Sequence, residues 1–163
     1  MAYRTPKHVQ EQKDIKRRHI LDSALRVFAR KGFYETSVQD ICKEADVSVG
    51  AIYFYFPNKD SVYEAVYSDI MNNLVSSIED AAKDETDVRK FIERSTRAAV
   101  TSMTSNIHVA RFFRVNSYQT NLKQKVDDVL RIGASHFLNI LERAIERGQI
   151  KPINGRKRHK MTT

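Results

Sequence analysis

The stretch from Thr36 to Lys59 constrains the fold more than any other, because it reads as two short helices joined by a tight turn. In its first part, apolar side chains recur at the spacing i, i+3, i+4 and i+7, which predicts a helix over residues 37–45 with one buried face. Asp46 follows this helix, and aspartate tolerates the left-handed backbone conformation that such a turn needs.

The second part of the stretch predicts another short helix, over residues 49–56. Ser48 is a suitable N-cap, since its hydroxyl oxygen can accept a hydrogen bond from an unpaired backbone N–H. Pro57 ends the helix, because the residue before a proline disfavours helical geometry. Two short helices around a tight turn form a helix-turn-helix, whose second helix can enter the major groove of DNA. An ordinary helical hairpin inside an all-α core is the alternative interpretation.

A helix before this stretch completes a three-helix head, the predicted DNA-binding domain of residues 14–57. Apolar residues at helical spacing, beginning with Ile15 and Ile20, predict a helix that starts at about Asp14 and ends at Gly32, a typical C-cap. The predicted core of the head consists of Leu21, Leu25, Phe28, Val38, Ile41, Val47, Ile52 and Phe56.

The two ends of the chain are basic. Residues 1–13 are predicted to form a flexible arm, which is either a frayed terminus or an arm that touches phosphate or the minor groove. Residues 153–163 have no periodicity and are predicted to be a disordered basic tail. The formal net charge is +8, made up of +3 in residues 1–60, −3 in residues 61–110 and +8 in residues 111–163. Net charge alone is therefore no proof that the head binds DNA.

Further helical patterns predict a helical-bundle body over residues 58–152. A long helix begins at Asn58, a suitable N-cap, and leaves the head for the body. Shorter patterns cover residues 88–103 and about 109–118, and the longest covers residues 122–147. The predicted fold class is all-α, with a three-helix helix-turn-helix DNA-binding head and a helical-bundle regulatory body.

Several functional classes find no support in the sequence. No run approaches the length of a transmembrane helix, and the N-terminus lacks a secretory h-region, so we expect a cytoplasmic protein with no membrane partner. The one cysteine, Cys42, lies on an apolar stripe and is expected to be a buried structural thiol. No metal-ligand spacing, Gly-rich phosphate loop or catalytic motif is present, so we expect no metal, no cofactor and no enzymatic activity.

The head resembles that of the TetR family of transcriptional regulators over about residues 17–67. The matching residues are Gly32, the run T-S-V-Q-D-I-C that starts at Thr36, the D-V-S turn at Asp46, and the run G-A-I-Y-F-Y-F-P-N-K that starts at Gly50. The match departs from the family pattern at Cys42, where alanine is usual, and at Asp46, where glycine is usual. Both replacements are compatible with the fold.

The resemblance implies roles for the matched positions. The residues that it places at base edges are Gln39, Ser48, Val49, Gly50 and Phe54. Those that it places at phosphates are Thr36, Ser37, Tyr53, Tyr55 and Lys59. Gln39 has the amide that suits bidentate recognition of adenine. Core packing is the alternative role for the two tyrosines.

For the body, the resemblance implies an all-α unit for dimerisation and for binding an unknown small-molecule effector. The candidate pocket residues are Phe91, Ser95, Met103, Phe112, Phe113, Tyr118 and His136. Packing in an ordinary core is the alternative for each of them, since methionine and aromatic stripes are usually core.

The implied function is a sequence-specific DNA-binding regulator: a ligand-released repressor that acts as a homodimer on a palindromic operator in double-stranded DNA. Family members continue with two dimer-forming helices after the stretch matched here by Gly148–Pro152, and only eleven residues follow it here. The usual dimer helices are thus expected to be absent. The alternative is a truncated regulator that acts as an interaction partner or does not bind DNA.

Overall fold

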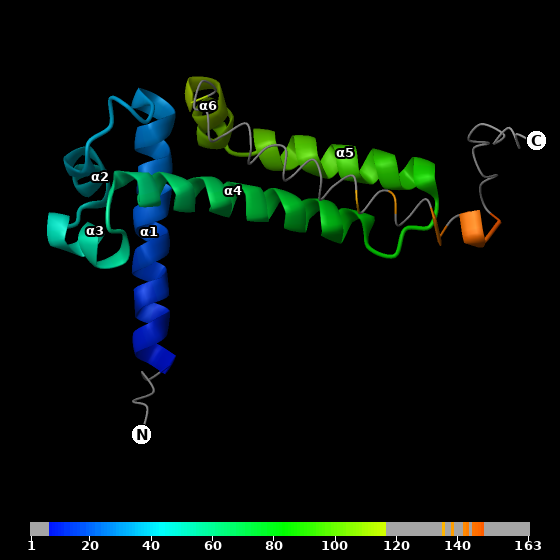
Figure 1. The fold of residues 1–163 in the computed structure, drawn as a ribbon, viewed down its shortest axis with the longest axis horizontal. Coiled ribbons are helices and arrows are strands. Elements are labelled where there is room, and N and C mark those ends of the chain that lie inside the picture. Colours follow the sequence, from blue (N-terminus) through cyan, green and yellow to red (C-terminus); the bar gives the residue numbers. More distant parts are fainter. Residues whose placement is uncertain (1–6, 117–134, 136–137, 139–141, 144, 149–163) are drawn as a thin grey trace, which may run out of the picture.

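The computed structural model describes residues 7–116, 135, 138, 142–143 and 145–148 of the chain. Within these residues the structure is all-α, as predicted (Figure 1). The helices are α1 (Lys7–Lys31), α2 (Val38–Ala45), α3 (Val49–Tyr55), α4 (Lys59–Ala82), α5 (Val88–Thr104) and α6 (Ile107–Asn116). This set contains only a few residues of the predicted helix over residues 122–147. The predicted tail over residues 153–163 lies outside it.

The helix-turn-helix forms where the sequence predicts it. Ser37 is the N-cap of α2, and Asp46 follows α2 in the left-handed conformation, with φ of 51°. Ser48 is the N-cap of α3, where its Oγ accepts a hydrogen bond from the backbone N–H of Ala51 at 3.2 Å. Asn58 likewise caps α4. Local capping and turn chemistry therefore account for the start of each of these helices.

The start of α1 differs from the prediction. The helix begins at Lys7 rather than at about residue 14, so residues 7–13 are helical and not a flexible arm. No glycine or proline interrupts the sequence between Pro6 and Gly32, and Gln10 donates a side-chain hydrogen bond to Asp14 one turn later. The first half of α1 extends beyond α2 and α3 (Figure 1), and Ile15, expected in the apolar stripe, is 61 % exposed there.

The core of the head agrees with the prediction in its main members. Phe28 and Ile41 are fully buried, and Ile52 and Phe56 fix α3 to the same core. Val38 and Val47 are only partly buried and lie at its edge. Cys42 is buried, as expected, and burial raises the pKa of its thiol.

The body begins with α4, which runs out of the head, and α5 packs along it (Figure 1). α6 then packs against α1, so the chain returns to the head. Among the described helices, none combines the length and apolar composition that crossing a bilayer requires.

The head and the body meet at a small cluster that we call the joint, composed of Phe28, Phe33, Tyr63, Phe112 and Asn116. The Tyr63 ring of α4 lies 5.1 Å from the rings of both Phe33 and Phe112, and 5.2 Å from that of Phe28. Asn116, at the end of α6, is buried. Its Oδ1 accepts from the Phe33 N–H at 2.9 Å, and its Nδ2 donates to the carbonyls of Phe112 and Phe28 at 2.8 and 3.3 Å.

Candidate nucleic-acid interface

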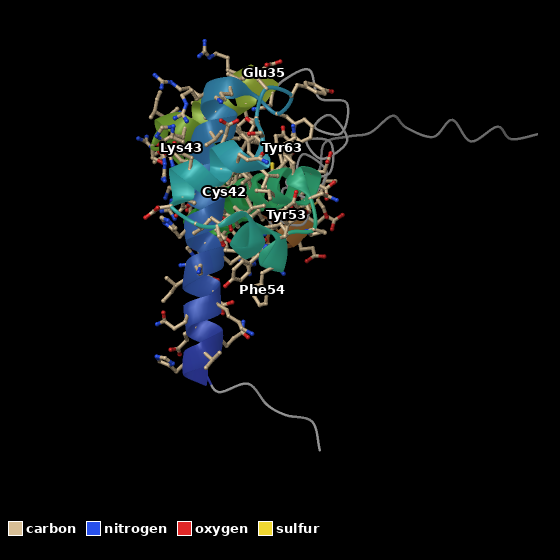
Figure 2. The ribbon with its side chains drawn as sticks, turned by 90° about the vertical axis from the view of Figure 1, so that its left-hand side faces the viewer. Glu35, Cys42, Lys43, Tyr53, Phe54 and Tyr63 are labelled. Carbon is tan, nitrogen blue, oxygen red and sulfur yellow. The ribbon has the colours of Figure 1, made fainter. Side chains whose placement is uncertain are left out.

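α3 presents one face to solvent and is fixed by the other. Ile52 is 1 % exposed and Phe56, just after the helix, is also buried, so this side belongs to the core of the head. On the outer side, Val49 is 39 % exposed, Tyr53 51 % and Phe54 66 % (Figure 2). Large apolar side chains held outward on a rigid helix mark a contact surface rather than a core.

Gly50 lies on the outer side of α3, in its first turn. A Cβ atom placed on this glycine would meet only the Ser48 Oγ, at 4.0 Å. The helix also does not need a positive φ at this position. Internal packing therefore leaves room for a side chain here, and the absence of one gives the N-terminal end of α3 a flat surface that another molecule can approach closely.

The two tyrosines of α3 differ in exposure. Tyr53 is exposed, whereas Tyr55 is half-buried and packs against the core of the head. The Tyr55 ring lies 4.9 Å from that of Phe54. The sequence motif places both rings at the helix surface, which is correct for Tyr53 and only partly correct for Tyr55. A helix of seven residues has few positions that avoid the core altogether.

The N-terminus of α2, predicted to hold a phosphate, is already close to a carboxylate. Asp40 accepts hydrogen bonds from the Ser37 backbone N–H at 2.9 Å and from the Ser37 hydroxyl at 2.8 Å. Lys31 of α1 donates to its other oxygen at 2.6 Å. The hydrogen bond from Lys31, followed by those from Ser37, holds the pKa of the Asp40 carboxyl well below its usual range.

Thr36 is not presented to a ligand in the way that the resemblance implies. Its side chain is buried, and its hydroxyl donates to the carbonyl oxygen of Gly32 at 2.6 Å. This contact fixes the end of α1 to the start of α2. Ser37 and Gln39, by contrast, are exposed on α2.

Lys59 is also engaged within the protein. Its Nζ donates to the carbonyl oxygens of Phe33 and Thr36, both at 2.8 Å, and lies 4.3 Å from the centre of the Phe33 ring. The ammonium therefore connects the first residue of α4 to the loop before α2.

The motif reasoning missed two cations that lie beside α3. The Lys13 Nζ is 5.7 Å from the centre of the Phe54 ring, and the Arg17 guanidinium is 5.2 Å from that of Phe56. Both belong to the first half of α1, part of which was expected to be a flexible arm. The four-residue spacing between them was the available signal, because it places them on one face of a helix.

The cations in the second half of α1 have acidic partners on α2. Arg26 and Arg30 both contact the Glu44 carboxylate, at 2.9 and 3.1 Å. The hydrogen bonds from Arg26 and then Arg30 lower the pKa of Glu44. The imidazole Nε2 of His19 lies 2.9 Å from the Ala45 carbonyl oxygen at the end of α2. These contacts hold α2 in place.

Five of the seven residues predicted to line an effector pocket lie within the described part of the chain. Phe91 and Phe112 are buried, and Phe112 belongs to the joint. Met103 and Phe113 are partly buried against the same core. The Ser95 hydroxyl is buried without a hydrogen-bond partner among the described residues. Tyr118 and His136 lie outside those residues.

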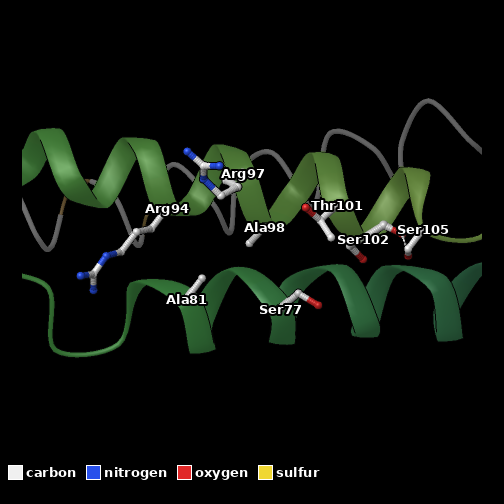
Figure 3. A pocket seen from close by; sticks show the side chains of 8 residues that line it. All are labelled: Ser77, Ala81, Arg94, Arg97, Ala98, Thr101, Ser102 and Ser105. Carbon is white, nitrogen blue, oxygen red and sulfur yellow. Dashed lines mark hydrogen bonds between the residues drawn. The ribbon is translucent and has the colours of Figure 1, made fainter.

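A groove of about 500 Å³ lies elsewhere in the body, between α4 and α5 (Figure 3). Its lining contains none of the predicted pocket residues and consists of Ser77, Ala81, Arg94, Arg97, Ala98, Thr101, Ser102 and Ser105. Arg94 and Arg97 contact Glu85 and Glu93 at 3.2 Å, so the groove has no unpaired positive charge from them. Within the described residues there is also no group of side chains that could hold a metal ion.

Comparison with known proteins also identifies the head as a helix-turn-helix domain. Residues 20–66, which include the whole helix-turn-helix, match the family described as bacterial regulatory proteins, tetR family. Over 67 residues the chain is 40 % identical to the HTH-type transcriptional regulator AcrR of Shigella flexneri, covering 41 % of this chain and 29 % of AcrR.

Other similarities extend into the body. The fatty acid metabolism regulator protein of Bacillus subtilis is 26 % identical over 143 residues, which are 86 % of this chain and 74 % of that protein. The crystal structure of the transcriptional regulator FadR from Bacillus subtilis in complex with stearoyl-CoA superposes with a TM-score of 0.69 at 26 % identity, over 82 % of this chain and 73 % of that one. FadR of Bacillus halodurans, at 24 % identity, shares the fold with a TM-score of 0.71, over 91 % and 74 % of the two chains.

The family match covers the same residues that build the exposed α3, and the likeness of fold extends over most of the chain. The head of the chain therefore matches the tetR family of bacterial regulatory proteins over residues 20–66, and the chain is a DNA-binding transcriptional regulator.

Proposed function

We propose that the protein is a repressor that binds a palindromic operator as a homodimer and leaves it when a small molecule binds the body. The observation that carries this proposal is the outer side of α3, where exposed aromatic side chains follow a flat, glycine-containing first turn. A helix of this kind can place its N-terminal end in the major groove.

The proposed base contacts come from the exposed residues of the head. Gln39 contributes an amide with a donor and an acceptor, and the Ser48 hydroxyl can still donate while it caps α3. Val49, Gly50 and Phe54 contribute close approach and apolar contact with a thymine methyl.

For the phosphate contacts, exposure favours Ser37 and Tyr53 over the other candidates. Tyr55 would contribute only its hydroxyl. Thr36 and Lys59 would act mainly by holding the loop before α2, because their polar groups already contact backbone carbonyls.

In this proposal the chain divides into the head, residues 14–57, and an effector-binding and dimerising body, residues 58–152. We include the whole of α1 in the proposed head, because this helix is continuous from Lys7. A dimer would place its two α3 helices about 34 Å apart, one turn of B-DNA, so that each reads one half-site.

The similarity to a protein crystallised with stearoyl-CoA suggests a long-chain acyl thioester as the first effector to test. A ligand of this class would need an apolar channel in the body for its chain. The Ser95 hydroxyl of α5, which is buried and has no hydrogen-bond partner among the described residues, is a candidate polar contact in such a channel.

Selection from a pool of random DNA duplexes tests the proposal. The full chain is expected to enrich a palindrome whose half-site centres are one helical turn, about 10 base pairs, or a multiple apart. Sedimentation of the complex with that duplex should show two chains. Stearoyl-CoA should release the duplex, and coenzyme A without an acyl chain is the control.

Failure of any duplex to be enriched would contradict DNA binding by this chain. Enrichment of a single half-site with one bound chain would contradict the dimer. Equal release by stearoyl-CoA and by coenzyme A, or release by neither, would contradict the acyl effector while leaving DNA binding in place.

A further inference from the structure

On the side of α1 that faces the head, the side chains are basic in the first half of the helix and apolar in the second half. From Leu21 onward this side is apolar and buried, at Leu21, Ala24, Leu25 and Phe28. One and two turns earlier, the same side carries Arg17 and Lys13, because residues four apart lie on one face of a helix. Lys16 lies next to them, three residues after Lys13. We call Lys13, Lys16 and Arg17 the basic ridge.

The basic ridge keeps its charge. Among the described residues, the α1 cations that form salt bridges are all in the second half of the helix: Arg26, Arg30 and Lys31. Lys13 and Arg17 lie instead over the rings of Phe54 and Phe56. An aromatic ring orients a cation with about 0.5–1 kcal/mol at an exposed site and does not neutralise it.

The position of the ridge identifies its partner. The first half of α1 extends past α3 (Figure 1), and the ridge contacts the same C-terminal end of α3 that displays Phe54. If α3 lies in a major groove, the ridge lies beside the groove, where the nearest surface of the DNA is its phosphate backbone.

We propose that the basic ridge is a second DNA-binding element, in which Lys13, Lys16 and Arg17 contact backbone phosphates beside the base pairs read by α3. This proposal rests on the proposed function, because it places α3 in the groove. The ridge adds affinity that does not depend on base sequence, and it lengthens the footprint of each head.

The test compares two charge-matched triple variants on the duplex selected by the wild-type protein. One is Lys13→Gln/Lys16→Gln/Arg17→Gln. The control is Lys83→Gln/Arg89→Gln/Lys90→Gln, three exposed cations at the far end of the body (Figure 1). Both remove the same net charge, so a difference between them reports position. Lys16→Gln alone is a further variant that disturbs no ring contact.

Each phosphate contact contributes about 0.9 to the slope of log K against log salt concentration. The ridge variant should lower that slope by about 2.7 per head, Lys16→Gln by about 0.9, and the control by close to zero. Trimming the flanks of the duplex should weaken the wild-type protein and the control, and have little effect on the ridge variant.

A ridge variant that remains folded and keeps the wild-type slope on the long duplex would overturn the inference and leave the proposed function intact. So would equal losses in the ridge variant and the control, because those would reflect net charge alone. If the wild-type chain selects no duplex, it is the proposed function that fails.

Discussion

The two halves of α1 contain the same kind of side chain in two different situations. In the second half, Arg26, Arg30 and Lys31 contact carboxylates of α2 and hold the helix-turn-helix in place. In the first half, Lys13 and Arg17 of the basic ridge lie over aromatic rings and remain charged. The role of a basic residue near a DNA-binding helix therefore depends on the groups that it contacts, and its place in the sequence does not determine that role.

Lys59 extends the comparison beyond α1. The family motif implies a phosphate contact for it, but its ammonium contacts two backbone carbonyls and a ring. By its partners it belongs with the cations that hold the head together.

The largest effect is expected at Asn116, a neutral group that connects α6 to the joint. Asn116→Leu removes three hydrogen bonds at a buried position, and at about 1 kcal/mol each this should lower the free energy of unfolding by about 3 kcal/mol. Denaturant titration measures the change. Asn72→Leu, on the exposed side of α4, is the control and should change stability little. Equal effects of the two substitutions would show that the joint does not connect body and head.

A smaller effect is expected for Lys59→Met, which keeps an unbranched side chain one atom shorter and removes the charge. Loss of the bonds to the Phe33 and Thr36 carbonyls should lower the free energy of unfolding by about 2 kcal/mol, since hydrogen bonds to charged groups are stronger than neutral ones and these carbonyls can regain water. Lys43→Met, on the exposed side of α2, is the control.

The salt dependence of DNA binding gives Lys59 a second readout. A side chain that stabilises the loop should leave the slope of log K against log salt unchanged in Lys59→Met. A slope lower by about 0.9, with stability unchanged, would show that Lys59 contacts a DNA phosphate.

Next in size is Glu44→Gln, which weakens the contacts with both Arg26 and Arg30. These side chains are partly exposed, so solvent screens them and the loss of stability should be about 0.5 kcal/mol. Glu35→Gln, an exposed residue before α2, is the control. A rise in DNA affinity without any loss of stability would mean that Glu44 acts on DNA and not on the head.

The smallest effect concerns acid pH. The folded-state pKa values of Asp40 and Glu44 are lowered from ordinary values of 3.8 and 4.5, so their contribution to stability is present above those values and is lost as the pH falls below them. Unfolding measured from pH 6 to pH 3 should show this loss, and Asp40→Asn/Glu44→Gln should have a flatter profile. If the wild-type and variant proteins lost stability in parallel as the pH falls, Asp40 and Glu44 would not be the groups responsible.

The sequence predicts those parts of the head that depend on neighbouring residues. The N-caps Ser48 and Asn58 and the left-handed Asp46 occur as predicted, because capping and turn geometry are set within a few residues. Ser37, expected as the first residue of its helix, is the N-cap of α2. The fold class follows from the helical spacing of the apolar residues.

Contacts between residues that are distant in the sequence could not be predicted from local sequence patterns. The Lys59 ammonium contacts a loop more than twenty positions earlier, and Asn116 contacts residues more than eighty positions earlier. Nothing local distinguishes these side chains from exposed ones. The start of α1 was missed for the opposite reason: the basic ridge interrupts the apolar pattern by which the helix was located.

The most direct test of the central claim, that the outer side of α3 meets DNA, is to place a side chain on Gly50. Gly50→Leu should leave the fold intact or stabilise it by up to about 1 kcal/mol, because the position has room and leucine favours helix more than glycine does. The same substitution should abolish binding of the selected duplex, because leucine would occupy the space that the bases need. Ser68→Leu, exposed on α4, is the control and should bind normally. A folded Gly50→Leu protein with wild-type affinity for the duplex would contradict the account.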